Sequence, residues 1–164
     1  MDSCAEQKKQ MLCRALMDRM NAPGQFSAHI HIRLTELTPD GRCTGELEVV
    51  PENLNLLGIV HGGALATLAD TVAGSAVAAA TGRACVTVSY GFNFLRPASG
   101  GRIVCSAYAE KLGRHICVMH ADLLDEKGEK VAAGETAWYF MNRSRIPAKA
   151  PRVMELSGRN VPSS

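Results

Sequence analysis

The sequence has few aromatic residues and no excess of either charge. Phe, Trp and Tyr make up 5% of the 164 residues, and 18 basic side chains oppose 16 acidic ones, for a formal net charge of +2. A balance this close to neutral provides no strong field to attract nucleic acid or an anionic membrane. The length suits one domain with a single core. We therefore expect one domain with a small-molecule partner, and no nucleic acid or membrane partner.

Paired cysteines and metal-binding motifs are also missing from the sequence. The six cysteines are scattered without a C-x-x-C pair. Neither a structural zinc site nor a disulfide framework is therefore expected, and the thiols should be reduced. The sequence has no P-loop and no G-x-G-x-x-G run, so we expect no metal and no cofactor. Residues 1–9 lack the apolar core of a secretory signal, which favours the cytoplasm.

One long apolar run, from Gly62 to Ala80, imitates a membrane-spanning segment. Asp70 lies at its middle, and an aspartate there costs about 2.5–3.5 kcal/mol on insertion, which a run rich in Ala and Gly does not offset. The run therefore predicts a buried helix. Because this helix is apolar on nearly every side, we expect a sheet to curl around it and a second subunit to cover the remainder.

The segments on either side of this helix predict an α+β fold. Residues 5–20 predict an amphipathic helix that either packs against its own domain or serves as a lid or docking element; its apolar positions are Met11, Leu12, Leu16 and Met20. Six strands are expected, at 29–36, 43–50, 84–95, 103–111, 115–124 and 130–141. We divide the chain into an N-terminal helix (1–24), a central domain (25–142) and a surface tail (143–164).

Side chains alternate in character along the strand expected at 84–95. Since successive side chains of a strand point to opposite faces, the pattern predicts one apolar face and one face of small polar residues. The apolar face would hold Val86, Val88, Tyr90, Phe92 and Phe94. The small polar face would hold Thr87, Ser89, Gly91 and Asn93.

The run from Asn55 to Asp70 reads N-x-x-G-x-x-H-G-G-x-x-x-x-x-x-D. This run resembles the signature of hotdog-fold thioesterases, nearest to the phenylacetate-pathway subgroup, and the resemblance covers roughly residues 28 to 141. It implies an antiparallel sheet wrapped around a long central helix, and hydrolysis of an acyl-CoA to a free acid and coenzyme A. It also implies that Asp70 of one chain faces His61-Gly62-Gly63 of a second chain. The apolar helix and the strand alternation predict a homodimer that pairs across a shared sheet and doubles to a homotetramer.

The glycines that open the long helix can stabilise a developing negative charge. The first N–H groups of a helix have no intrahelical acceptor and lie at the positive end of the helix dipole. Gly62 and Gly63 also lack a Cβ, so a carbonyl can approach the backbone closely. We expect Gly62 to donate to the oxyanion and Gly63 to contact the substrate. His61, immediately before the helix, is a candidate general base, although a capping role is favoured.

Asp70 is the only charge in the apolar helix, and we interpret it as the base or nucleophile; the alternative is a structural carboxylate that caps a loop.

Asn55 is a candidate for binding the carbonyl, the water or the leaving sulfur, or is a simple turn residue. The resemblance implies that Thr87 bonds the attacking water; a surface threonine is the alternative. Ser89 is expected to bind substrate. Arg96 is the first candidate for the coenzyme A phosphates, or is a solvated charge.

These residues leave two hypotheses for function. The first is a thioesterase with an aspartate base or nucleophile and a helix N-terminal oxyanion site. The second is a non-enzymatic acyl-CoA binding or sensing module on the same fold, which has no need for a buried carboxylate. The acyl group itself, whether fatty or aryl, is not readable from the sequence.

Overall fold

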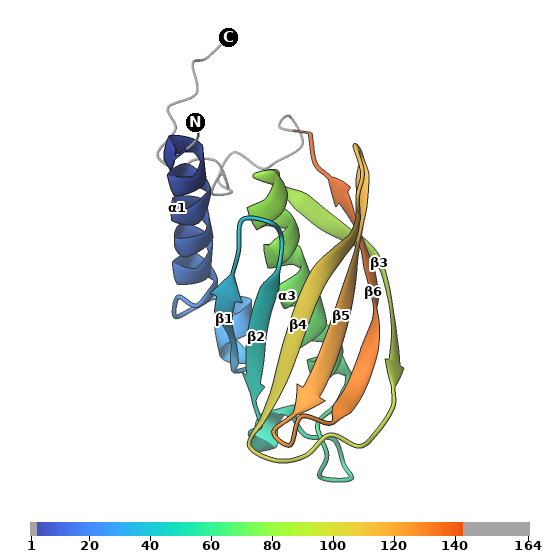
Figure 1. Cartoon of the computed structure of the whole chain (residues 1–164). Coiled ribbons are helices and arrows are strands. Elements are labelled where there is room, and N and C mark those ends of the chain that lie inside the picture. The colour runs from blue at the N-terminus through green and yellow to red at the C-terminus, as the bar shows by residue number, and fades with distance from the viewer. Residues whose placement is uncertain (1–2, 143–164) are drawn as a thin grey trace.

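A single antiparallel sheet of six strands curls around one long helix in the computed structural model, which describes residues 3–142 (Figure 1). The strand order is β1-β2-β4-β5-β6-β3, and every neighbouring pair is antiparallel. The strands are β1 (Ile32–Leu37), β2 (Cys43–Glu48), β3 (Cys85–Phe94), β4 (Arg102–Leu112), β5 (Ile116–Asp125) and β6 (Lys130–Phe140). The helices are α1 (Ser3–Met20), α2 (Phe26–His29), the 3-10 turn η1 (Pro51–Asn53) and α3 (Gly62–Thr81). The α+β class and the wrapped central helix are confirmed.

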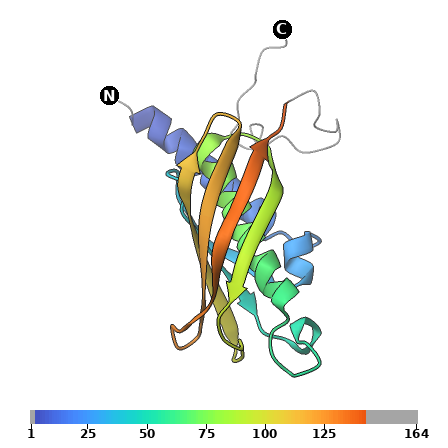
Figure 2. The same ribbon diagram turned by 90° about the vertical axis from the view of Figure 1, so that its right-hand side faces the viewer.

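Helix α3 is the centre of the hydrophobic core. By length and composition it is the one helix of the described chain that suits a membrane span, yet it packs within the curl of the sheet. Leu68, Val72 and Val77 on it are fully buried. Gly82 ends the helix in the left-handed conformation at φ 63°, which a glycine adopts without steric cost. Figure 2 shows the helix crossing behind β5, β6 and β3. The expected buried helix is confirmed.

Helix α1 packs beside β1 at one end of the sheet (Figure 1). Its buried side chains are Leu12, Cys13 and Leu16. Met11, expected on the packed face, is 52% exposed, and Cys13 lies inside instead. Of the two alternatives for this helix, the contacts show packing against its own domain. The tail expected at 143–164 lies outside the described residues.

The beginning of the first strand is a correction to the sequence prediction. A strand was expected from His29, but His29 ends the short helix α2, and β1 begins at Ile32. His31 between them has a positive φ of 61°, a backbone conformation rare for a non-glycine residue. The chain therefore turns sharply where the sequence pattern suggested extended backbone.

An irregularity in β3 reverses which face its side chains occupy. The register with β6 shifts between Thr87 and Ser89, as in a β-bulge, so Val88 is an extra residue. Thr87 faces α3, whereas Ser89, Gly91 and Asn93 line a hollow on the outer face of the sheet. The prediction of one small polar face along this strand is wrong, because one inserted residue flips every later side chain.

Candidate active site

Asp70 and Thr87 are in direct contact where the middle of α3 passes β3. The Thr87 hydroxyl donates a hydrogen bond of 2.8 Å to Oδ1 of the Asp70 carboxylate. The two residues are 17 apart in the sequence, and the bulge in β3 turns Thr87 toward the helix. The same hydroxyl oxygen keeps its lone pairs, so it can also accept a hydrogen bond from a water molecule. The contact therefore gives Asp70 a fixed orientation.

The surroundings of Asp70 alter the pKa of its carboxyl group. Burial raises the pKa of the Asp70 carboxyl above its ordinary value, because desolvation disfavours the charged form, and the bond from Thr87 opposes this shift. No other charged side chain belongs to α3. A partly desolvated carboxylate held by one hydroxyl is a stronger base than an exposed one.

His61 is the residue that caps α3. Its Nδ1 accepts a hydrogen bond of 2.9 Å from the Gly63 N–H. This contact requires Nδ1 without a proton, so the neutral ring carries its proton on Nε2. The Gly63 N–H, expected to be free for substrate, is therefore engaged in this chain. The Gly62 N–H has no acceptor among residues 3–142 and stays available as a donor.

Asn55 organises the loop that leads into α3. Its side-chain oxygen accepts from the Leu57 N–H at 2.8 Å and from the Ile59 N–H at 3.4 Å. Gly58, at φ 73°, completes the tight turn. Because the oxygen of the amide is engaged, its NH₂ group is the part that can contact a ligand.

A pocket of about 320 Å³ lies between this loop and the chain after β3. Asn55, Gly62 and Arg96 all line it, and so do Phe94 and Leu95. The ring of Phe94 lies beside Gly62, within 3.5 Å of where a Cβ would be. The side chain of Arg96 is 55% exposed, and its guanidinium pairs with Glu129. An ion pair this exposed stabilises little, so the arginine can exchange its partner for another anion.

The Asp70 carboxylate and the Gly62 N–H lie on α3 eight residues apart. A rise of 1.5 Å per residue places them about 12 Å apart along the helix axis. A carbonyl has to lie within about 3 Å of both the base and the oxyanion donor. The two groups of one chain therefore cannot act on the same carbonyl.

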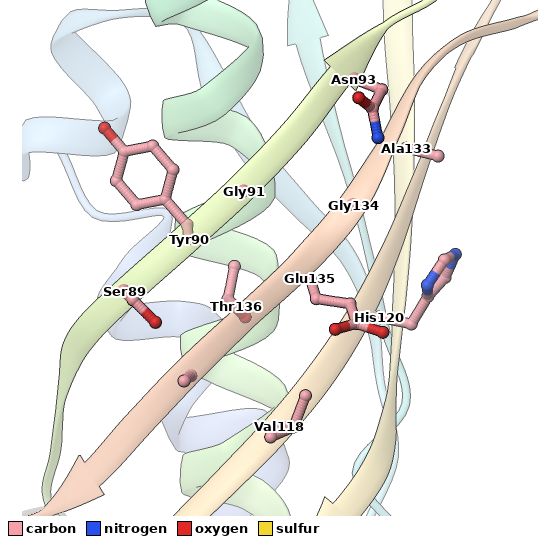
Figure 3. Close-up of a pocket in the computed structure, with 11 residues that line it drawn as sticks. Ser89, Tyr90, Gly91, Asn93, Val118, His120, Ala133, Gly134, Glu135 and Thr136 are labelled. Carbon is pink, nitrogen blue, oxygen red and sulfur yellow. The ribbon is translucent and has the colours of Figure 1, made fainter.

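Ser89 lies apart from both groups. It lines a shallow hollow of about 600 Å³ on the outer face of the sheet, where Asn93, His120 and Glu135 also lie (Figure 3). In that view α3 lies behind the strands, on the opposite face. The structure thus brings together Asn55, Gly62 and Arg96, and separately Asp70 and Thr87, but it does not bring Ser89 to either group.

The cysteines offer no competing nucleophile in the described core. All six are free thiols. Burial raises the pKa of Cys43 and of Cys85 to about 12, so these thiols carry no thiolate at neutral pH. In the part of the chain that the structure describes, no group of three or more His, Cys, Asp or Glu is placed to hold a metal ion.

Trp138 is a neighbour of the Asp70 site that the sequence did not single out. It lies opposite Thr87 in the pairing of β3 with β6, and its ring touches α3 at Gly74, one turn beyond Asp70. In the sequence it is one apolar residue among several in an expected strand. Its contact with the helix depends on strand register and on a glycine 64 residues earlier, and no local pattern encodes that pairing.

Comparison with known proteins gives a consistent result. The family model for the thioesterase superfamily matches residues 57–132. Human acyl-coenzyme A thioesterase 13 is 31% identical over 114 residues, which is 68% of this chain and 81% of that protein. A hypothetical thioesterase from Streptococcus pneumoniae, solved with coenzyme A, is 26% identical over 68% of this chain and 86% of its own, with a TM-score of 0.64.

The Escherichia coli PaaI protein of the phenylacetic acid degradation operon has the same fold. Its TM-score is 0.73 over 84% of this chain and 96% of its own, at 21% identity. The curled sheet and the central helix are thus those of the hotdog fold.

Proposed function

Because this chain belongs to the hotdog-fold thioesterase superfamily, we propose that it hydrolyses acyl-CoA thioesters to a free carboxylic acid and coenzyme A. Family membership supports thioester hydrolysis. The choice of coenzyme A as the carrier is supported by the similarity to acyl-coenzyme A thioesterase 13 and to a structure that contains coenzyme A.

The observation that carries the proposal is the hydrogen bond between Thr87 and the half-buried Asp70 carboxylate. In the proposed reaction this carboxylate acts as the base that activates water, or attacks the thioester carbon itself. Both routes require the ionised form. Thr87 orients the carboxylate and accepts a hydrogen bond from the water. A carboxylate with this contact inside an apolar helix has no evident packing role, which favours the enzyme over the binding or sensing module.

The proposed oxyanion donor is the Gly62 N–H at the start of α3. It lies at the positive end of the helix dipole, and its acceptor position is open. His61 holds the first turn in shape through the Gly63 N–H, and we assign it this positioning role. Asn55 lines the same pocket, and we assign its NH₂ group the role of holding the thioester oxygen or sulfur.

Two chains are needed to bring these groups together. Asp70 and Gly62 of one chain are about 12 Å apart along the helix, so we propose that the donor comes from a second copy. Strand β3 is the outer strand at one end of the sheet, and Val86, Val88 and Tyr90 on it are exposed. An outer strand with unpaired backbone and apolar side chains is suited to pairing with its equivalent in another copy. We further propose that two such dimers form a homotetramer.

Arg96 is the proposed contact for the phosphates of coenzyme A. It lies at the edge of the pocket that contains Gly62, and its pairing with Glu129 is exposed enough to be exchanged. The proposed location is the cytoplasm, since free thiols are typical of a reducing compartment.

Release of free coenzyme A thiol from a series of acyl-CoAs tests this function. The wild-type protein should release thiol from at least one member, and Asp70→Asn should not do so at a comparable rate. Tight binding of acyl-CoA without any thiol release, in both proteins, would instead establish the binding module. Light scattering of the wild-type protein should show no stable monomer, and a monodisperse monomer with full activity would contradict the shared site.

A further inference from the structure

Four residues lie near one another around the proposed catalytic carboxylate. Asp70 bonds Thr87, Thr87 lies opposite Trp138 on the neighbouring strand, and Trp138 contacts Gly74. Gly74 lies four residues after Asp70, so both are on one face of α3. The ring of Trp138 therefore meets α3 one turn from Asp70, on the side of Asp70 that leads toward the C-terminal half of the helix.

The indole of Trp138 is fixed at both ends. Its Nε1–H donates a hydrogen bond of 2.8 Å to the Thr136 hydroxyl, and Thr136 is itself fully buried. At the other end, a Cβ on Gly74 would lie 2.4 Å from the ring atom Cη2. Only glycine permits this approach, so Gly74 forms a notch in α3 that the ring fills. Trp138 is 6% exposed, and a ring held in this way does not move aside easily.

We propose that Trp138 forms the end wall of the acyl pocket and limits the enzyme to short or flat acyl groups. This inference rests on the proposed function, because it places the thioester carbonyl beside Asp70. In the proposed arrangement the sulfur and the pantetheine chain lead from that carbonyl toward solvent, and the acyl group extends toward the indole. The helix on either side of Gly74 is packed in the core, since Ala73, Ala76 and Val77 are fully buried.

The chemistry of the wall favours some acyl groups over others. An indole surface packs well against an aryl ring or a short alkyl chain. A longer chain meets the ring and gains nothing from further methylene groups. Until the acyl chain is long enough to reach the ring, each added methylene that becomes buried should tighten binding about fourfold, the equivalent of about 0.8 kcal/mol. For chains longer than this, the affinity should stop rising.

Binding of S-alkyl-CoA thioethers tests this proposal without depending on hydrolysis, because the thioether bond is not cleaved. Trp138 is the only tryptophan of the chain, so its fluorescence reports contact at the proposed wall. In the assembled wild-type protein, S-alkyl-CoA should change the emission and coenzyme A alone should not. Calorimetry over a series of chain lengths should show the affinity reaching a plateau.

Trp138→Leu should move the plateau to longer chains, because it removes most of the wall. Trp138→Phe is a milder change that keeps the core filled, so it should move the plateau less. It also provides a variant that should fold if Trp138→Leu does not. Phe140→Leu is the matched control, since Phe140 is a buried aromatic residue two positions further along the same strand. It should keep both the wild-type plateau and the fluorescence response.

The inference is overturned if alkyl thioethers bind without changing the Trp138 emission, or if the plateau is the same in wild type and in both Trp138 variants. The hydrolysis assay is read separately. A plateau that moves as expected in a protein that releases no thiol would defeat the proposed function and leave the assignment of the wall intact.

Discussion

The start and the middle of α3 differ in what they offer to a substrate. At the start, a backbone N–H is open, a pocket of about 320 Å³ lies against it, and the nearby charge is an exposed arginine. At the middle, a carboxylate is half-buried and already bonded to Thr87. One end can bind an anionic oxygen and the other can supply a base. Since about 12 Å of helix separates them, the proposed mechanism divides each chain into two half-sites that are completed by a second copy.

Asp70→Asn should have the largest effect on activity. The amide keeps the size of the side chain but removes its basicity and nucleophilicity, so the rate of thiol release should fall about 10²- to 10⁴-fold. Substrate-analogue affinity should stay within a few-fold of wild type. An unchanged hydrolysis rate would show that Asp70 takes no part in the reaction.

The same variant should also be at least as stable as wild type at neutral pH. Burial raises the pKa of Asp70 in the folded state, so the folded protein binds a proton more readily than the unfolded chain. Ionisation of Asp70 therefore costs stability as pH rises, and Asn avoids that cost. Thermal melts should converge below about pH 3.9, where an unfolded aspartate is also protonated.

Gly62→Pro tests the start of the helix without breaking it. Proline is favoured at the first helical position, and His61 before it has the extended backbone that a following proline requires. The change removes the N–H, so turnover should fall about 10²- to 10³-fold. Gly62→Ala is the control, because it keeps the N–H and its Cβ meets Phe94 only at an ordinary contact distance of 3.5 Å. Equal rates in the two variants would show that this N–H is not the oxyanion donor.

Thr87→Ala should lower turnover about tenfold to a hundredfold with little change in the Michaelis constant, because the lost contact acts mainly in the transition state. The bond from Thr87 holds the pKa of Asp70 down against burial. Without it the pKa should rise further, so the acid limb of the pH-rate profile should move to higher pH. Thr87→Ser retains the hydroxyl and should restore the wild-type profile. If the acid limb of the Thr87→Ala profile stays at the wild-type pH, Thr87 does not act on the group whose ionisation controls the rate.

Arg96→Ala should have the smallest effect. Phosphate contacts at an exposed position are screened by solvent and salt, so we expect the Michaelis constant for acyl-CoA to rise only a few-fold while turnover is retained. Acyl-pantetheine, which lacks the nucleotide phosphates, should be hydrolysed equally well by wild type and by the variant. A loss of similar size with acyl-pantetheine would mean that Arg96 acts on something other than phosphate.

The order of the main elements and the buried central helix were predictable from periodicity, because α3 is apolar throughout and its single charge stands out. The signature from Asn55 to Asp70 also predicted that Asn55 and Gly62 act together, and in the structure both line one pocket. The bulge at Val88 was not predictable, since an inserted residue has no signature in an alternating strand, and it moved Ser89 to the face opposite Thr87. The contact of Trp138 with Gly74 was hidden for a similar reason, because it depends on packing between distant segments.

Subunit exchange between Asp70→Asn and Gly62→Pro tests most directly whether each site takes its two halves from two chains. Either variant alone should be nearly inactive. After mixing in equal amounts, half of the dimers should combine the two variants, and each of these should contain one intact site, so activity should recover to about a quarter of the wild-type rate. If exchange is confirmed by mass spectrometry and the activity stays at the level of the separate variants, the two halves act within one chain and the account is contradicted.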